Sequence, residues 1–353
     1  MNLESWLMTP PSAITRTPPQ RSWGGEWESH WRRHPRFARS SPAMAEQRVI
    51  VVTGPTASGK SALALALAEW LRGTVINADA MQTYNAFPML TAQPTAAERA
   101  RVPHVLYGVL PLSEALSAAR WRALASAEIE RCFGEARTPV LCGGSGLYLR
   151  TLMQGIAAIP EAPAELREQA NADWQAMGAD AFRIRLAEHD PEVVARLEPG
   201  DRQRHVRAWE VWLATGRPIS AWQAEAPHGE PAPWRFVTIV LAPQRAWLRD
   251  RIATRFDAML AGGVLPEVRA VFDTSPDPRW PGLKAHGAPE LFAHFRGALT
   301  LDDARRIAID HTRQYAKRQM TWIRHQMAPH LVLEVPPAPD VDTVEKFLTN
   351  SGA

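Results

Sequence analysis

Residues 51–61 read VVTGPTASGKS, an apolar run followed by a glycine-rich loop that ends in Lys and Ser. From Gly54 to Ser61 the loop fits the P-loop pattern Gly-x-x-x-x-Gly-Lys-Ser. Its surroundings also fit, because the sequence predicts a strand at 49–53 and a helix at 61–71. The stretch therefore predicts a phosphate site at the start of an α/β domain.

The rest of the chain repeats this alternation of strands and helices. A short strand is expected at 74–78, and the apolar runs PVLC (139–142) and WRFVTIVLAP (234–243) predict further buried strands. Strands that alternate with helices favour an open parallel sheet with helices on both faces. The predicted fold class is α/β: a P-loop NTPase-like parallel sheet plus a helical insertion domain.

The domain organisation follows from changes in composition. Residues 1–45 are rich in Pro, Arg, Ser and Trp without strand or helix periodicity, which predicts disorder or an early start codon, with translation beginning at Met44. A basic tail that touches RNA or a membrane is the alternative. The remaining segments are a catalytic core at 46–158 and 200–335, a polar helical insertion at 159–199 and a C-terminal tail at 336–353.

Composition narrows the class of protein. The chain has 353 residues, 46% of them hydrophobic, which is enough for one or two domains. Cys132 and Cys142 lack metal-ligand spacing and are interpreted as small buried residues of a protein in a reducing compartment. No apolar run is long enough to span a bilayer, so we expect a cytoplasmic protein without a membrane partner. Because the net charge is only +3, nucleic-acid binding would depend on local basic patches.

Polar residues follow two of the expected strands. Asp79 comes after the strand at 74–78, at the carboxyl edge of the sheet beside the phosphate loop, where a carboxylate can accept a proton. It can equally cap the following turn, and Gln82 can reach a base edge or complete that cap. Ser145, in the glycine turn 143–146, offers a hydroxyl near a ligand, although tight packing also explains such glycines.

Several motifs together resemble one family. GPTASGKS, NADAMQTY, LCGGSGLYLRTL, DRQRHVRAWEVWLATG, KAHGAPEL and QYAKRQMTWIR follow one another in the order of the tRNA dimethylallyltransferases, also called tRNA isopentenyltransferases. The resemblance covers about residues 48–330. Many nucleotide-binding and ATP-binding proteins share the P-loop, whereas the later motifs together are specific to this family.

The resemblance implies a prenyl transfer. A dimethylallyl group would pass from dimethylallyl diphosphate to the exocyclic N6 amine of the adenine immediately 3′ of the anticodon, in tRNAs that read codons beginning with U. Diphosphate would be released, and Mg²⁺ is the implied cofactor, with Ser61 as its protein ligand. The residues implied to bind the diphosphate are Gly54, Pro55, Thr56, Ala57, Ser58, Gly59, Lys60 and Ser61.

The resemblance also assigns catalytic and RNA-binding residues. Asp79, Ser145 and Lys60 are the implied catalytic residues; Asp79 accepts the amine proton, and Ser145 stands where the family usually has Thr. The implied partner is the anticodon stem-loop of tRNA, contacted also by the insertion, and a monomer is expected. The implied tRNA-binding residues are Asp79, Ala80, Met81, Gln82, Ser145, Arg167, Gln203, Arg204, His205, Val206, Arg207, Lys284, Ala285, His286, Gly287, Ala288 and Pro289.

Four positions depart from the family pattern, and two other functions stay open. Ala80, Leu90, Gln93 and Val105 stand where the family usually has Ser, Gly, Lys and His. One alternative is a small-molecule P-loop kinase, which would consume ATP without RNA. The other is a tRNA-binding protein whose catalytic site has decayed, which would bind RNA with a steep salt dependence and form no product.

Overall fold

A parallel sheet forms the centre of the molecule. The computed structural model describes residues 47–225, 232–335 and 341–350, so the N-terminal extension and the alternative start at Met44 lie outside the described residues. The strand order is β3-β2-β4-β1-β5-β6, and all neighbours pair in parallel, as the sequence predicts. The strands are β1 (Arg48–Thr53), β2 (Thr74–Asn77), β3 (His104–Val105), β4 (Pro139–Cys142), β5 (Arg235–Pro243) and β6 (Leu331–Val335).

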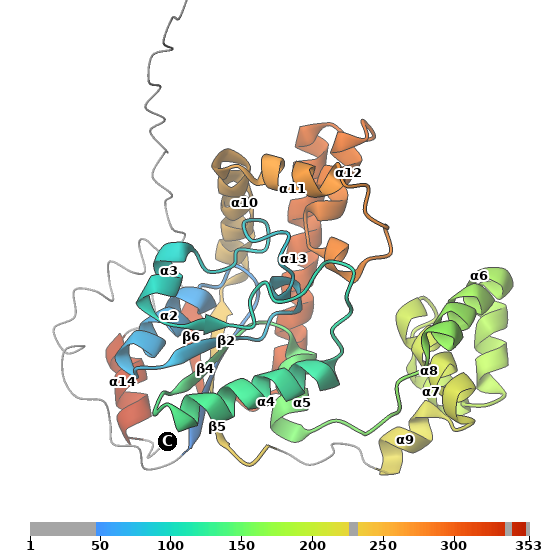
Figure 1. Cartoon of the computed structure of the whole chain (residues 1–353), viewed down its shortest axis with the longest axis horizontal. Helices are drawn as coiled ribbons and strands as arrows, with labels where there is room; N and C mark the ends of the chain where they lie inside the picture. Colours follow the sequence, from blue (N-terminus) through green and yellow to red (C-terminus); the bar gives the residue numbers. More distant parts are fainter. Residues whose placement is uncertain (1–46, 226–231, 336–340, 351–353) are drawn as a thin grey trace, which may run out of the picture.

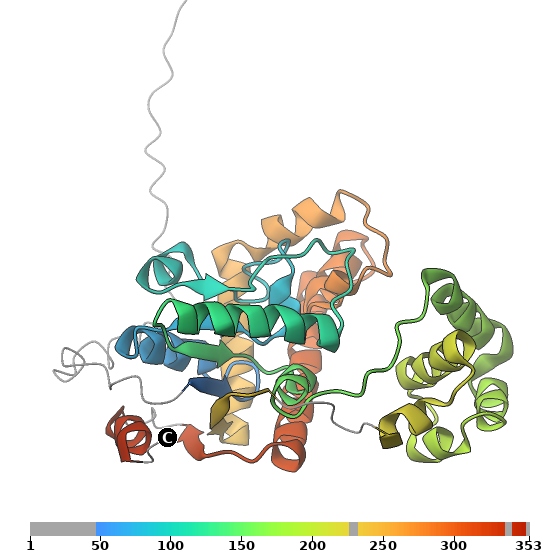
Figure 2. The ribbon, with the colours of Figure 1, turned by 60° about the horizontal axis from the view of Figure 1, so that its bottom comes forward.

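Helices cover both faces of this sheet (Figures 1 and 2). The side chains of β1 alternate between the faces. Ile50 and Val52 belong to one hydrophobic cluster with α2 (Lys60–Trp70), whereas Val49 and Val51 belong to a second cluster with α4 (Ala118–Gly134) and α5 (Gly146–Gln154). The remaining elements of this part are the 3-10 helix η2 (Ala80–Thr83) and α3 (Ala96–Arg101).

A second helical layer lies beyond the carboxyl edge of the sheet. It has its own hydrophobic cluster, in which Leu248, Ile252 and Phe256 pack with Phe87 and Leu90 of the loop after η2. This layer brings residues from distant parts of the chain next to the P-loop (Figure 1). Its elements are α10 (Arg245–Gly262), α11 (Val264–Phe272), η3 (Pro281–Lys284), α12 (Ala288–Phe295) and α13 (Leu301–Gln326).

The helical insertion is longer than the predicted segment 159–199. Its hydrophobic cluster joins Phe182 and Leu186 to Trp209 and Ile219, so the predicted end at 199 is wrong. The apolar stripe of the helix at Arg202–Thr215 packs onto the helix at Ala164–Ala187, so residues up to Glu225 belong to the insertion and not to the catalytic core. Figures 1 and 2 show this unit to one side of the sheet. Its helices are α6 (Ala164–Ala187), α7 (Pro191–Arg196), α8 (Arg202–Thr215) and α9 (Ile219–Glu225).

The C-terminal segment also differs from its prediction as a tail. Residues Val341–Asn350 form helix α14, and Val344 and Leu348 are buried in the same cluster as α2. An amphipathic helix can bury apolar side chains at i and i+4, and this one covers the sheet. Within the described ranges, every helix is too short or too polar to cross a lipid bilayer.

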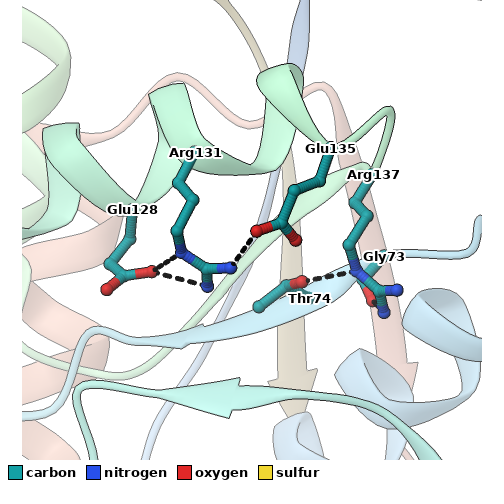
Figure 3. Close-up of polar contacts among 6 residues, drawn as sticks. All are labelled: Gly73, Thr74, Glu128, Arg131, Glu135 and Arg137. Atoms are coloured by element: carbon teal, nitrogen blue, oxygen red, sulfur yellow. Dashed lines mark hydrogen bonds and ion pairs between the residues drawn. The ribbon is translucent and has the colours of Figure 1, made fainter.

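Polar contacts fix the end of the sheet opposite the P-loop (Figure 3). Arg137, just before β4, donates to the carbonyl of Gly73 and to the hydroxyl of Thr74, at the start of β2. On α4, Arg131 pairs with Glu128 and Glu135. Cys132 and Cys142 are free and buried, as predicted.

Candidate active site

Three loops meet at the carboxyl edge of the sheet. The P-loop follows β1, Asp79 follows β2, and the glycine turn 143–146 follows β4. Since β4 lies between β1 and β2, the turn sits between the other two loops. This is the edge where open parallel sheets bind their ligands.

The P-loop has the backbone that an anion site requires. Gly59 caps α2 with a φ of 95°, and Ala57 has a φ of 64°, a left-handed conformation that is costly for a residue with a Cβ. Such loops turn backbone N–H groups toward a bound anion at a helix N-terminus. Lys60 Nζ donates to the carbonyl of Pro55 at 3.2 Å, so its charge lies over the loop. Burial lowers the pKa of Lys60, and the nearby charge of Asp79 opposes that shift.

Asp79 is held in place by hydrogen bonds of its backbone and its side chain. Its N–H donates to Asn77 Oδ1 at 2.8 Å, while Asn77 Nδ2 donates to the carbonyls of Asp79 and Leu106. One carboxylate oxygen of Asp79 accepts the Met81 N–H at 3.0 Å and so caps η2. The capping role that the sequence left open is therefore present, and Asp79 also lines the pocket described below.

Ser145 connects the glycine turn to the Asp79 loop. Its hydroxyl accepts the N–H of Ala80 at 2.9 Å, and its own N–H donates to the carbonyl of Ala78 at 3.1 Å. Two members of the predicted catalytic set, Asp79 and Ser145, thus lie side by side. The close approach depends on Gly143, where a Cβ would stand 2.1 Å from the carbonyl carbon of Ala78.

Gly143→Ala should lower the free energy of unfolding by about 1–3 kcal/mol, because the added methyl group must push two buried strand ends apart. Urea denaturation measures this loss. Gly134→Ala is the matched control, since nothing lies within 4 Å of its Cβ position and it ends a helix; it should add about 0.5–1 kcal/mol. A Gly143→Ala protein as stable as the wild type would contradict this packing.

A pocket opens between these loops and α10. Thr56 and Asp79 lie at its polar end together with Arg255, whose guanidinium donates to Thr56 Oγ1 at 2.8 Å. Burial lowers the pKa of Arg255 to about 10, against the raising effect of nearby Asp79. His286, Thr312 and Tyr315 also line the pocket. Its apolar wall consists of Met81, Leu90, Ile252, Phe256 and Met259.

Arg255 is a pocket residue that was not predicted from the sequence. A signal was present, because Ile252, Phe256 and Met259 recur at the spacing of one helix face and Arg255 interrupts that stripe. A charged residue within a buried stripe needs a partner or a ligand. The same argument applies to Gln319, which lies among Ala316 and Ile323 on the buried face of α13.

The predicted tRNA-binding residues fall into two groups. Asp79, Met81 and His286 line the pocket, whereas Arg167 of α6 and the segment 203–207 of α8 lie on the separate insertion (Figure 1). Asp201 caps α8 by accepting the Arg204 N–H at 3.2 Å. On this helix Gln203 and Arg204 are exposed, and Arg207 pairs with Glu210.

Several of the predicted tRNA-binding residues have buried side chains. His205 is completely buried and Val206 is 5% exposed, because both pack inside the insertion. Ala285 and Ala288 are each 1% exposed and pack in the second helical layer, beside buried Gly287. In the same segment, the side chains of Lys284 and Pro289 are exposed to solvent.

The loop that carries the departures Leu90 and Gln93 is held by hydrogen bonds, and Leu90 forms part of the pocket wall. The backbone N–H groups of Met89 and Leu90 donate to the two carboxylate oxygens of Glu267 at 2.7 and 2.9 Å. Gln82 Nε2 donates to the carbonyls of Thr91 and Ala92, and Gln93 Nε2 donates to the carbonyl of Tyr84. The amide nitrogens of both glutamines therefore hold this loop against the site.

Comparison with known proteins assigns this arrangement to a family. The family model described as IPP transferase matches residues 82–326, more than half of the chain. The chain belongs to the tRNA dimethylallyltransferase family. It is 51% identical over 284 residues to the tRNA dimethylallyltransferase of Rhodospirillum centenum, covering 80% of this chain and 90% of that one. It is 50% identical over 292 residues to the tRNA dimethylallyltransferase of Acidiphilium cryptum, covering 83% and 87%.

Solved structures of the tRNA dimethylallyltransferase family have the same fold. The full-length tRNA isopentenylpyrophosphate transferase of Bacillus halodurans is 29% identical, with a TM-score of 0.63 over 87% of this chain and 96% of that one. A eukaryotic dimethylallyltransferase acting on tRNA is 24% identical, with a TM-score of 0.70 over 86% and 77% of the two chains. The P-loop NTPase-like fold and the family predicted from the motifs are thus confirmed.

Proposed function

We propose that the chain transfers a dimethylallyl group from dimethylallyl diphosphate to the exocyclic N6 amine of the adenine immediately 3′ of the anticodon, in tRNAs that read codons beginning with U. The observation that carries this proposal is the pocket in which Asp79 lies between a P-loop and an apolar wall. A diphosphate suits the P-loop end, and a five-carbon chain suits the wall formed with α10. The family shares this reaction class.

The chemistry assigns each group a task. The allylic C–O bond breaks and its electron pair leaves on the diphosphate, while the N6 lone pair forms the new C–N bond. The amine proton passes to the Asp79 carboxylate. Lys60, Arg255 and the P-loop amides stabilise the negative charge that grows on the leaving group, which lowers the barrier because these donors are already in place.

The RNA must present its adenine to a recessed site. Because a stacked base cannot reach Asp79, the adenine is expected to leave the anticodon loop and enter the pocket. His286 and Tyr315 line the pocket with aromatic rings whose centroids lie 4.7 Å apart. Burial lowers the pKa of His286, so the ring is neutral at physiological pH and can pack against a neutral base.

Mg²⁺ fits the same end of the site. Among the described residues, no three His, Cys, Asp or Glu side chains gather into a metal cluster, so the ion would rely on substrate oxygens. Ser61 is exposed in the first turn of α2, and a hydroxyl with diphosphate oxygens and water is the oxygen donor set that Mg²⁺ prefers. When bound, the ion would neutralise part of the diphosphate charge.

We also propose that the enzyme acts as a monomer, which light scattering would test.

A transfer assay tests the proposal against its alternatives. The protein is incubated with dimethylallyl diphosphate, Mg²⁺ and an unmodified anticodon stem-loop, and the digested nucleosides are weighed by mass spectrometry. The proposal predicts a prenylated adenosine, and its loss when that adenine is replaced by guanine. ATP consumption without RNA would support the kinase alternative. Salt-sensitive RNA binding without product would indicate a decayed enzyme.

The insertion should contribute to RNA affinity. The side chain of Arg204 is 73% exposed, so Arg204→Gln should weaken tRNA binding severalfold and reduce the slope of log K against log salt by about one, as expected for one lost phosphate contact. Filter binding at several salt concentrations measures both quantities. Arg131→Gln, on α4, is the control with the same chemical change. Equal salt slopes for the wild type and Arg204→Gln would exclude a phosphate contact.

A further inference from the structure

Gln319 joins two of the three loops that form the site. The residue is 5% exposed and lies on the buried face of α13. Its Oε1 accepts the backbone N–H of Thr56 in the P-loop at 2.8 Å, and its Nε2 donates to the backbone carbonyl of Gly144 in the glycine turn at 3.0 Å. One amide group thus uses its acceptor on one loop and its donor on the other.

The fit between α13 and the glycine turn leaves no space. A Cβ on Gly144 would stand 2.1 Å from Gln319 Nε2, and a Cβ on Gly146 would stand 2.2 Å from the Trp322 ring. Gln319 and Trp322 are three residues apart and therefore share a helix face. The glycine turn can move relative to α13 only if the Gln319–Gly144 hydrogen bond and the packing of Trp322 against Gly146 are lost.

The same face of α13 is also connected to the Asp79 loop, through Ser145. The Tyr315 phenol, one helical turn before Gln319, lies close to the side chains of Ser145 and Gln319 and lines the pocket with Asp79. Ser145 in turn accepts the N–H of Ala80, the residue after Asp79. A chain of contacts therefore runs from Thr56 through Gln319 and the glycine turn to the Asp79 loop.

We propose that Gln319 is a positioning residue: it fixes the P-loop relative to the glycine turn, so that the diphosphate and the Asp79 carboxylate keep a constant separation. This inference rests on the proposed function. The role requires an amide, because one end must accept and the other must donate. An ionised carboxylate cannot donate to Gly144, and a thioether of similar length can replace neither strong hydrogen bond. A misplacement of about 1 Å between reacting groups costs up to 10²-fold in rate.

Gln319→Met is the first test. The variant should lower kcat by about 10- to 100-fold and raise the KM for dimethylallyl diphosphate, because the two loops no longer hold the substrate in register. The Kd for the anticodon stem-loop should stay within about twofold, since the insertion is untouched. A purely structural role would reduce the amount of folded enzyme and leave the KM unchanged, so the split between KM and kcat decides between the two.

Two further variants complete the test. Gln319→Glu keeps the size and the acceptor for Thr56 and should lose kcat in the same way. Gln314→Met, at an exposed position of the same helix, should leave both constants unchanged. Wild-type kinetic constants in either folded Gln319 variant would overturn the proposal, as would unfolding of both variants. Absence of product from the wild type would instead contradict the proposed function.

Discussion

Asp79→Asn should lower kcat by about 10²–10⁴-fold, the range for loss of a general base. Asparagine keeps the oxygen that caps η2 through the Met81 N–H, so the local fold should survive. What disappears is the group that takes the proton from the amine. Rapid-quench kinetics with prelabelled dimethylallyl diphosphate measures the chemical step directly.

The binding steps give the control for Asp79. The Kd values for diphosphate and for the anticodon stem-loop should change little, because the P-loop and the insertion stay intact. Asp277 is a partly exposed carboxylate outside the pocket that pairs with Arg279, so Asp277→Asn should behave as the wild type. If Asp79→Asn kept more than about a third of the wild-type kcat, Asp79 would not be the base.

Arg255→Gln should produce the second large effect. Its guanidinium holds the Thr56 hydroxyl at the polar end of the pocket and stands beside the expected leaving group. Removal of one preorganised donor to a developing anion costs about 10²–10³-fold in kcat. The KM for dimethylallyl diphosphate should rise as well, because the same charge attracts the bound substrate. Steady-state kinetics with varied diphosphate substrate measures both constants.

A neighbouring arginine tests whether this effect is specific. Arg249 lies on the same helix with an exposed side chain, so Arg249→Gln makes the same change away from the pocket. It should leave the kinetic constants for dimethylallyl diphosphate unaltered. Equal losses in the two variants would mean that Arg255 acts only through the general charge of α10.

The central sheet was predictable because its signals are local. The apolar run before the P-loop, the helix after it and the later runs at β4 and β5 each identify an element within about ten residues. The position of Asp79 was predictable for the same reason, since a residue directly after a parallel strand must lie at the carboxyl edge. The family motifs then supplied the reaction.

The contacts contributed by later helices were not predictable from local patterns. Arg255 and Gln319 reach the P-loop from 199 and 263 residues away along the chain, and only the packing of α10 and α13 brings them there. The predicted end of the insertion at 199 was too early. The apolar stripe of α8 would suit a helix of the catalytic core as well as a helix of the insertion. Hydrophobic periodicity shows that α8 has an apolar face, but it does not show that this face packs against α6.

The central claim is that dimethylallyl diphosphate and the adenine meet at Asp79 between the P-loop and α10. A crystal structure with the unreactive thiolodiphosphate analogue of the substrate and an anticodon stem-loop tests it most directly. The account predicts the diphosphate on the P-loop and N6 of the extruded adenine at about 2.6–3.2 Å from an Asp79 carboxylate oxygen. A diphosphate bound outside the P-loop, or an adenine still stacked in its loop with Asp79 unoccupied, would contradict the account.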